Sequence, residues 1–411
     1  MPGTWPAALI HAARRYRLEA GFVAGLLAGL LFGEGIVWVR PLGELFLVAL
    51  KLLGPPLALL VLVSALVSMS GGKLGRLGLK SASWYLLTAL AAATIGVTVA
   101  SVLGAGSGLS LGDASGTLAL QPGRDVPPTQ SWVARMGALI HGPVMIAAFI
   151  AGFVVIFVAG WRRSSELPGN RGWRRLLDHG TQAAFRMLAW VMVYAPVGVF
   201  AITAVTVAGL RLTSATALLT ILLAVYLAQV AVCIGCLLIV QVRLRACGVF
   251  LRAVRDALLT ALVSGSSAAT VPLEFRALEQ GLGMPRAQVG VVLPLGLAMH
   301  KLGTAVHQAV ILVFAATAMG QAPTLAWSGG LVLLAVLASA ITPPVSGGSA
   351  VALTLVFGWI GLPLEAIALG IAIPLLGKLN TPLNSLGRLV SAVALVDRSG
   401  RQASEGAAPA P

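Results

Sequence analysis

The sequence predicts an all-α membrane protein, and two observations lead to this fold class. Of the 411 residues, 58% are hydrophobic and only 10% are charged, whereas soluble domains carry about 25% charged residues. Apolar runs also recur along the chain, several of them about 18 residues or longer, the length that a helix needs to cross a bilayer. Because lipid offers no hydrogen bonds to an exposed backbone, these runs must be helical.

In chain order, the apolar runs lie at residues 18–38, 46–69, 84–103, 144–160, 217–240 and around 331–341. No Ala-x-Ala cleavage site follows the first run, so we expect an uncleaved first helix rather than a removed signal. Residues 103–132 carry several glycines and prolines, and we expect an external loop there. The segment 399–411 is rich in Ala, Pro and Gly, and we expect it to be disordered.

The net charge of +15 could indicate nucleic-acid binding, but the distribution of the cations argues against it. Most lie in short loops without interleaved aromatic residues, at residues 14–17, 73–80, 162–175, 243–255, 276–286 and 398–401. The opposite set of loops carries little beyond Arg40, Arg124 and Arg211. This asymmetry is typical of a bacterial-type inner-membrane protein. It predicts that both termini are cytoplasmic, and it leaves no role for nucleic acid.

One apolar stretch has cytoplasmic charge at both ends, at Arg252 and Arg286. A segment that enters and leaves a membrane on the same side is re-entrant. Its centre reads SGSSAATVP at residues 264–272, and these small hydroxyl residues and the proline favour a helix–break–helix. Unwound backbone is tolerated at membrane depth where it lines a cavity. The alternative is a Ser/Thr face for helix packing.

A second break is predicted at residues 342–349, which read TPPVSGGS, because two prolines and two glycines cannot continue a straight helix. Two interrupted segments in a hydrophobic chain are a pointer to a transporter binding site. Ionisable residues at membrane depth are costly and usually functional. In this chain, the ionisable residues expected at membrane depth outside the two breaks are His300, Lys301, His307, Lys378 and Arg388. Helical spacing puts Gly377, Asn380, Thr381, Asn384 and Arg388 on one face.

The residues indicate neither an enzyme nor a cofactor or metal site. Cys233 and Cys236 form a C-x-x-C pattern inside an apolar run, without a second pair, which favours packing over redox or zinc chemistry. A serine of the first break could face His300 or His307, but the sequence offers no acidic residue to orient either histidine.

Several motifs show a resemblance to a known family. They are PLGELFL at 41–47, KLGRLG at 73–78, YAPVGVF at 194–200, SSAATVP at 266–272 and LPLG at 293–296. With them the chain resembles the dicarboxylate/amino acid:cation symporter family, the glutamate-transporter-like proteins, over residues 18–397. The stretch at 194–200 is the most specific of these matches.

The resemblance implies eight transmembrane helices and two re-entrant helical hairpins in an elevator-type transporter fold. A trimerising scaffold would comprise residues 1–79 and 131–210. A mobile transport domain would comprise residues 80–104 and 211–398, with an external loop at 105–130 and a tail at 399–411. The family works by alternating access, and the expected partners are a lipid bilayer, two further copies of the chain and a small anionic solute.

The resemblance also implies a substrate site. The asparagine that holds the substrate carboxylate in the family matches Asn384, and its neighbouring threonine matches Thr381. The family's arginine for an acidic side chain falls at Asn380, and its aspartate for an amino group falls at Gly377. The substrate-binding residues that we expect are Ser266, Ser267, Thr304, Val345, Ser346, Gly347, Asn380, Thr381 and Asn384.

The departures from the family pattern concern sodium. Where the family has Asn-Met-Asp-Gly-Thr, this chain has His300, Lys301, Leu302, Gly303 and Thr304, so the sodium-binding aspartate is missing. A second sodium-site aspartate falls at Arg388. The last two helices contain no acidic residue in their cores, and cations disfavour a sodium ion beside them. The sequence therefore predicts that sodium coupling is lost.

Two interpretations of these cations stay open. Lys301 and Arg388 could be fixed substitutes for bound sodium, in a uniporter or exchanger. Alternatively, Lys301 or the histidines could carry protons in a proton-coupled symporter. In either case the expected solute is a small mono- or dicarboxylate, since the anchor for an amino group is absent. An anion channel or a pseudo-transporter is a further alternative, and trans-acceleration by the solute would separate a carrier from a channel.

Overall fold

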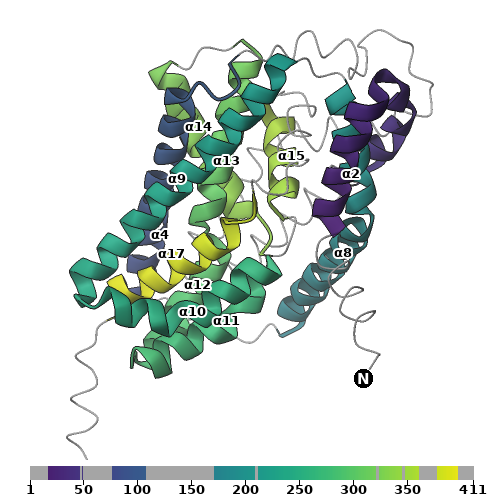
Figure 1. Cartoon of the computed structure of the whole chain (residues 1–411). Helices are drawn as coiled ribbons and strands as arrows, with labels where there is room; N and C mark the ends of the chain where they lie inside the picture. Colours follow the sequence, from purple (N-terminus) through teal and green to yellow (C-terminus); the bar gives the residue numbers. More distant parts are fainter. Residues whose placement is uncertain are drawn as a thin grey trace, which may run out of the picture.

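The computed structural model describes residues 17–46, 49, 76–107, 171–208, 212–320, 324–344, 348–360 and 377–396, and every regular element in this part is helical. The prediction of an all-α chain is therefore confirmed for these residues (Figure 1). The predicted run at 144–160 and the tail at 399–411 lie outside the described residues, as do nearly all of the run at 46–69 and of the external loop.

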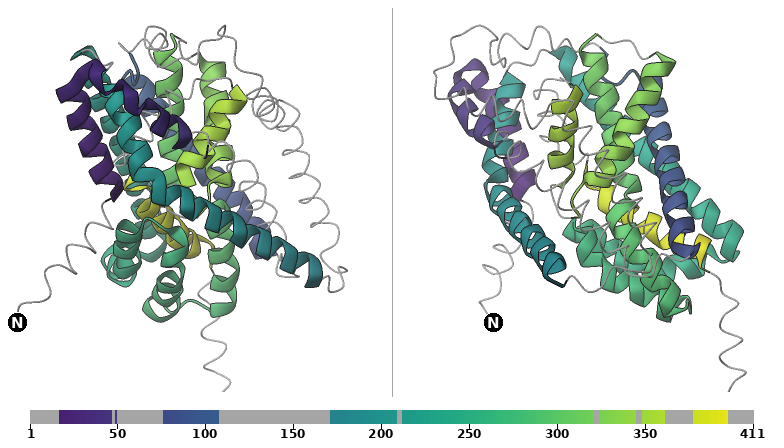
Figure 2. Two further views of the ribbon diagram at one scale, coloured as in Figure 1. Left: turned by 90° about the vertical axis from the view of Figure 1, so that its right-hand side faces the viewer. Right: turned by 180° about the vertical axis from the view of Figure 1, so that it is seen from behind.

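The helices fall into two groups. The first comprises α2 (Arg17–Phe32), the 3₁₀ helix η1 (Gly33–Val39) and α8 (Arg171–Ala208). The second comprises α4 (Arg76–Val102), α9 (Leu212–Leu244), α10 (Cys247–Ser264), α11 (Ser267–Arg276), the π-helix η3 (Ala277–Gly281), α12 (Arg286–Met299), α13 (Leu302–Ala318), α14 (Leu325–Ile341), α15 (Gly348–Ile360) and α17 (Asn380–Leu395). The elements pack mainly within their own group, and Figure 2 shows α2 against α8 from two further directions.

Small residues hold α2 against α8. Gly21, Gly25 and Gly29 recur every four residues along one face of α2 and lie against backbone carbonyl groups of α8. A Cβ atom at Gly25 would lie 2.5 Å from the carbonyl oxygen of Phe200. Glycines at this spacing let two helix backbones approach closely. The YAPVGVF motif at 194–200 therefore provides the surface on which the first helix packs.

Helix α13 is the core of the second group. Every one of its residues except Thr317 is buried, and it packs against α4, α9, α14 and α17. Since its polar residues cannot reach solvent, their hydrogen bonds must come from neighbouring helices. The candidate site is built from these contacts.

The first predicted break is confirmed, and it is shorter than the motif suggested. Helix α10 ends at Ser264, Gly265 takes a left-handed conformation with φ of 61°, and Ser266 is extended. A φ of this sign favours glycine. Helix α11 begins at Ser267, so the rest of the SSAATVP motif is helical, and α11 doubles back against α10.

The second break is also present. Helix α14 ends at Ile341 and α15 begins at Gly348, with the two prolines between them. A third interruption, which the residue pattern does not predict, separates α12 from α13. His300 and Lys301 are non-helical there. They divide a stretch of mostly apolar residues, which could have formed one helix, into two helices.

The last helix begins later than predicted. Gly377 and Lys378 lie in a turn before α17, which starts at Asn380. The predicted helical face is therefore wrong for Gly377, a residue that favours turns over helix interiors. It is correct for Asn380, Thr381, Asn384 and Arg388, all of which lie on α17 and are buried.

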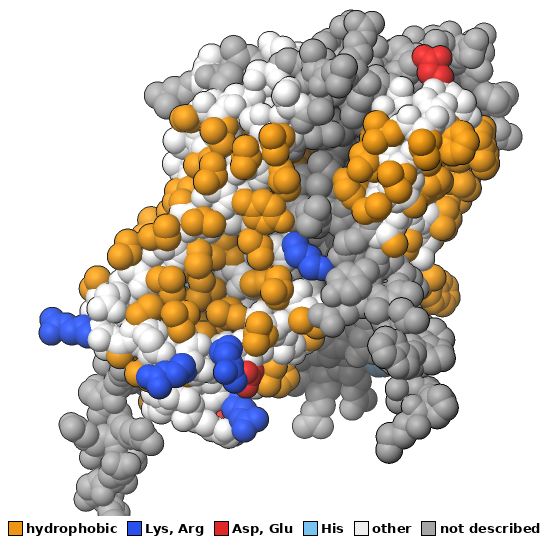
Figure 3. Space-filling model, in the orientation of Figure 1, with side chains coloured by type: hydrophobic (Ala, Val, Ile, Leu, Met, Phe, Trp, Pro, Cys, Tyr) orange, Lys and Arg blue, Asp and Glu red, His pale blue; other side chains and the backbone are white. Residues whose placement is uncertain are grey.

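The surface is that of a membrane protein. The described part contains four helical stretches that are long and apolar enough to cross a bilayer, at Ala20–Phe46, Arg76–Val102, Leu219–Leu244 and Arg286–Ala318. On the face that Figure 3 shows, hydrophobic side chains cover both helix groups, and most of the basic side chains lie at one end. The exposed arginines at the ends of α9 to α12 are Arg243, Arg245, Arg252, Arg255, Arg276 and Arg286.

Candidate functional site

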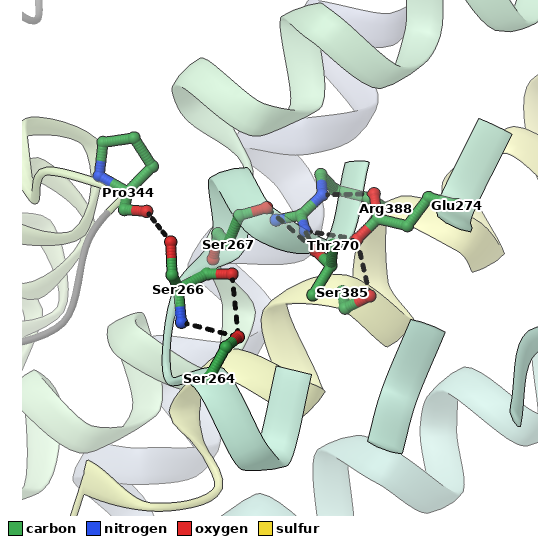
Figure 4. Close-up of polar contacts among 8 residues, drawn as sticks. All are labelled: Ser264, Ser266, Ser267, Thr270, Glu274, Pro344, Ser385 and Arg388. Carbon is green, nitrogen blue, oxygen red and sulfur yellow. Dashed lines mark hydrogen bonds and ion pairs between the residues drawn. The ribbon is translucent and has the colours of Figure 1, made fainter. Parts of the chain in front are cut away.

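The tips of the two helical hairpins, α10–α11 and α14–α15, touch each other. The carbonyl oxygen of Pro344 accepts hydrogen bonds from the hydroxyl of Ser266 at 3.3 Å and from the backbone N–H of Ala268 at 3.2 Å. Figure 4 shows Ser266 directed at Pro344, with Ser267 on the side of the last helix. Ser267 is 4% exposed. Two segments 78 residues apart in sequence therefore meet where both are unwound.

Asn384 and Thr304 form a second pair, between α17 and α13. The side-chain amide of Asn384 donates to the hydroxyl of Thr304 at 2.9 Å and accepts from its backbone N–H at 3.2 Å. Thr381 lies nearly one turn earlier on α17 and is 8% exposed. The structure thus brings together Thr304 and Asn384, two of the predicted substrate residues, and places Thr381 on the same buried helix.

Asn380 belongs to a chain of neutral hydrogen bonds. Its side-chain oxygen accepts from Gln229 of α9 at 2.7 Å, and its nitrogen lies 3.1 Å from Nδ1 of His307. The same ring nitrogen lies 3.2 Å from the hydroxyl of Ser349 on α15. Gln229 was not among the predicted site residues. A lone amide in the apolar run at 217–240 is the signal that could have identified it.

Arg388 is paired with a carboxylate that sequence reasoning missed. Its Nε donates to Oε2 of Glu274 at 2.9 Å, and its Nη2 donates to Oε1 at 2.5 Å. Both side chains are fully buried. The hydroxyls of Thr270 and Ser385 also donate to Oε1 of Glu274, at 2.8 and 2.6 Å. Figure 4 shows this cluster, which joins α11 to α17.

Arg388 is therefore not a lone cation. The two last helices do lack carboxylates, but the first hairpin contributes Glu274 from 114 positions away. A bidentate pair of this kind neutralises both charges and fixes the geometry of the guanidinium group. The signal was an acidic residue two positions after Pro272, on the short helix α11 that follows the break.

Lys301 occupies a different environment, at the break between α12 and α13. Its ammonium group donates to the carbonyl oxygen of Ala298 at 2.7 Å and to that of Ala340 at 3.3 Å. These carbonyls lie at the C-terminal ends of α12 and α14, where helix dipoles favour a cation. Lys301 is 1% exposed, and no carboxylate pairs with it in the part of the chain that the structure describes.

His300 packs against α4. Its ring stacks on Tyr85 with 4.6 Å between the ring centroids, and its Nε2 lies 2.8 Å from the hydroxyl of Thr88. Gly387 makes room for it, since a Cβ atom there would lie 3.1 Å from Cε1 of the ring. His300 and His307 are thus both engaged by neutral groups. Of the predicted substrate residues, Val345, Ser346 and Gly347 lie outside the described residues.

Comparison with known proteins assigns the family. A profile of the sodium:dicarboxylate symporter family matches residues 16–398. The proton/sodium-glutamate symport protein of Bacillus subtilis is 25% identical over 409 residues, covering 92% of this chain and 93% of that protein. The C4-dicarboxylate transport protein 1 of Pseudomonas paraeruginosa is 31% identical over 332 residues, covering 72% and 70%.

A third relative is the proton/glutamate-aspartate symporter of Escherichia coli, which is 26% identical over 382 residues and covers 87% of this chain and 84% of that protein. The family profile spans nearly the whole chain, and the apolar helices agree with a multi-pass membrane protein. The resemblance inferred from the motifs is thereby confirmed. The chain belongs to the sodium:dicarboxylate symporter family.

Proposed function

We propose that this protein is a sodium-independent secondary carrier for a small carboxylate-bearing solute. The relatives are named for glutamate, aspartate or C4-dicarboxylates, which supports a carboxylate as the shared chemical group. Asn384, Thr381 and the hairpin serines supply neutral donors that suit one carboxylate group. In this proposal Ser266, Ser267, Thr304, Asn380, Thr381 and Asn384 bind the solute, together with Val345, Ser346 and Gly347.

The environment of Lys301 is the observation that carries sodium independence. Carbonyl oxygens at helix ends are hard oxygen ligands of the kind that metal cations use. Here the carbonyls of Ala298 and Ala340 bind the ammonium group of Lys301. A covalently attached cation thus ties α12 to the second hairpin, a task that a bound ion could otherwise perform. A sodium ion at the same oxygens would be repelled by it.

Arg388 acts in the same way between α11 and α17, where it ties the first hairpin to the last helix through Glu274. Both hairpins are therefore fastened to the core by side-chain cations. A domain that carries its own cations does not need to capture ions before it closes around a solute. His300 fills the remaining space beside α4 with a neutral ring in this proposal.

The elevator mechanism is part of the proposal. The separation of α2, η1 and α8 from the other helices supports a scaffold and a mobile transport domain. Eight spanning helices, two re-entrant hairpins, a homotrimer and an inner-membrane location are also part of the proposal, and membership of the family supports them. Cytoplasmic termini are supported by the exposed arginines at one end of the described helices.

A proton-coupled symporter is the second candidate function, and one observation favours it. Lys301 is bound by carbonyl oxygens alone among the described residues, so loss of its proton would leave no carboxylate unpaired. A carrier that loads a proton with its solute would follow a pH gradient, whereas a fixed-cation exchanger would not.

Reconstitution in liposomes tests the proposal. Uptake of labelled carboxylates should be the same in sodium and in choline medium, should saturate and should accelerate when the same solute is inside. Steep stimulation by sodium would refute the fixed-cation account. Uptake driven by a pH step would favour the second candidate. Flux without saturation or trans-acceleration would indicate a channel.

A further inference from the structure

The neutral hydrogen-bond network around Asn380 carries an inference about the solute, and it rests on the proposed function. The network comprises Gln229, Asn380, His307 and Ser349, which come from four different helices. The first three are 2%, 6% and 4% exposed. Asn380 lies one helical turn before Asn384, so the network adjoins the residues proposed to hold a carboxylate.

Two atoms of this network have no partner among the described residues. They are Oε1 of Gln229 and Nε2 of His307. Buried polar atoms are rarely left unpaired, because each costs free energy. An orphaned atom on either side of Asn380 therefore points to a ligand that completes the network.

The direction of the hydrogen bonds defines what that ligand must offer. Gln229 donates to Asn380, and Asn380 donates to Nδ1 of a singly protonated His307 ring. This leaves Gln229 with a free acceptor and His307 with a free N–H donor at Nε2. Reversing the whole chain exchanges the two roles, but it still leaves one donor and one acceptor.

We propose that the solute of this carrier is a monocarboxylate whose second end is a neutral group with both a donor and an acceptor, such as a primary amide. An amide N–H pairs with Oε1 of Gln229, and its carbonyl oxygen accepts from Nε2 of His307. A second carboxylate offers acceptors only, so it leaves the Gln229 oxygen unpaired and facing a negative charge. A site built in this way discriminates through the group that it leaves unpaired.

The buried charges support the same conclusion independently. Three charged side chains are buried in the described part of the chain, and they are Lys301, Arg388 and Glu274. Two positive charges and one negative charge sum to +1. A monoanion brings the sum of these three buried charges and the solute to zero, whereas a dianion takes it to −1. Charge is costly at membrane depth, so the monoanion-loaded domain crosses with the smaller penalty.

Matched pairs of acids test this inference in proteoliposomes at neutral pH. The probes are malonate, succinate and glutarate, each compared with its half-amide, namely malonamate, succinamate and glutaramate. We expect at least one half-amide to be taken up about tenfold faster than its matched dicarboxylate. Faster uptake of the dicarboxylates would overturn the inference and leave the carboxylate carrier intact. Uptake of none of the six acids would overturn the proposed function, and the inference with it.

A variant assigns the preference to the network. Gln229→Leu should reduce the ratio of half-amide to dicarboxylate uptake by about three- to tenfold. Gln241→Leu, on the exposed end of the same helix, should leave the ratio unchanged. A ratio within one preparation does not depend on how much protein folds. An unchanged ratio in Gln229→Leu would overturn the assignment.

Voltage provides a test that needs no variant. One-for-one exchange of the preferred half-amide should proceed at the same rate with and without a potassium diffusion potential set by valinomycin, because the three buried charges and the monoanion sum to zero. An exchange rate that changed with the potential would show that the loaded domain carries net charge and would overturn the charge balance.

Discussion

The buried pair of Glu274 and Arg388 gives the sharpest prediction for stability. Glu274→Gln keeps the size of the side chain but removes the negative charge, so a guanidinium group that is 0% exposed loses its counter-ion. Breaking a buried ion pair from one side costs about 3–5 kcal/mol. We expect a loss of this size in the free energy of unfolding.

Two controls separate charge from packing. Asp256→Asn removes the carboxylate of an ion pair with Arg255 in which both side chains are more than 70% exposed, and it should cost no more than about 1 kcal/mol. The double variant Glu274→Met with Arg388→Met replaces both charges by apolar chains. It should recover most of the free energy of unfolding that Glu274→Gln loses, because well-packed apolar residues are often as stable as a buried ion pair.

The assay is reversible unfolding in mixed detergent micelles, followed by tryptophan fluorescence. Trp84 is a suitable reporter, since its indole N–H donates to Ser391 of α17 at 3.1 Å. The reasoning would be refuted if Glu274→Gln unfolded at the same detergent fraction as Asp256→Asn. It would also be refuted if the double variant lost as much free energy of unfolding as Glu274→Gln.

Three further predictions concern the helix breaks and the site. Lys301→Met should free the end of α14 from α12. The rate of backbone amide deuterium exchange near Ala340 should rise by about tenfold or more, because a hydrogen bond to a charged group contributes about 1.5–3 kcal/mol. An unchanged exchange rate would show that the ammonium group does not hold the two helices together. Gly303→Ala places a Cβ atom 2.5 Å from the carbonyl oxygen of Asn380, and it should lower the free energy of unfolding by about 1–3 kcal/mol; a wild-type unfolding curve would contradict this packing. Asn384→Leu should raise the half-saturating concentration for uptake by about tenfold or more, since a donor to the carboxylate is lost; wild-type saturation would remove Asn384 from the site.

Much of the fold could be predicted because bilayer physics constrains composition and length. The apolar runs indicated helices. The charges on both sides of residues 264–272, and the small residues within that segment, indicated the first break. The break at His300 and Lys301 was harder to predict, since neither residue is a proline or a glycine. One of the contacts at this break is tertiary, since the ammonium group of Lys301 donates to the carbonyl oxygen of Ala340, 39 positions away, as well as to that of the nearby Ala298.

The site was predicted in part, and the misses share one physical reason. Glu274 and Gln229 lie outside the two last helices, 114 and 151 positions from the residues that they bind. Sequence spacing reports neighbours on one helix, but it does not report partners across a bundle. A lone polar residue in an apolar run signals that a partner exists without identifying it. The sequence therefore shows Arg388 in a helix without acidic residues, whereas in the structure it pairs with Glu274 of another helix.

The central claim is that side-chain cations stand where the transport cycle would otherwise need sodium. The most direct measurement is the entry of radioactive sodium and of a labelled carboxylate into the same proteoliposomes, compared with vesicles that lack the protein. We predict that sodium entry stays at the level of the passive leak while the carboxylate accumulates or exchanges. Entry of one or more sodium ions with each solute molecule would contradict the account, and the carbonyls that bind Lys301 would then have to be released to an ion during transport.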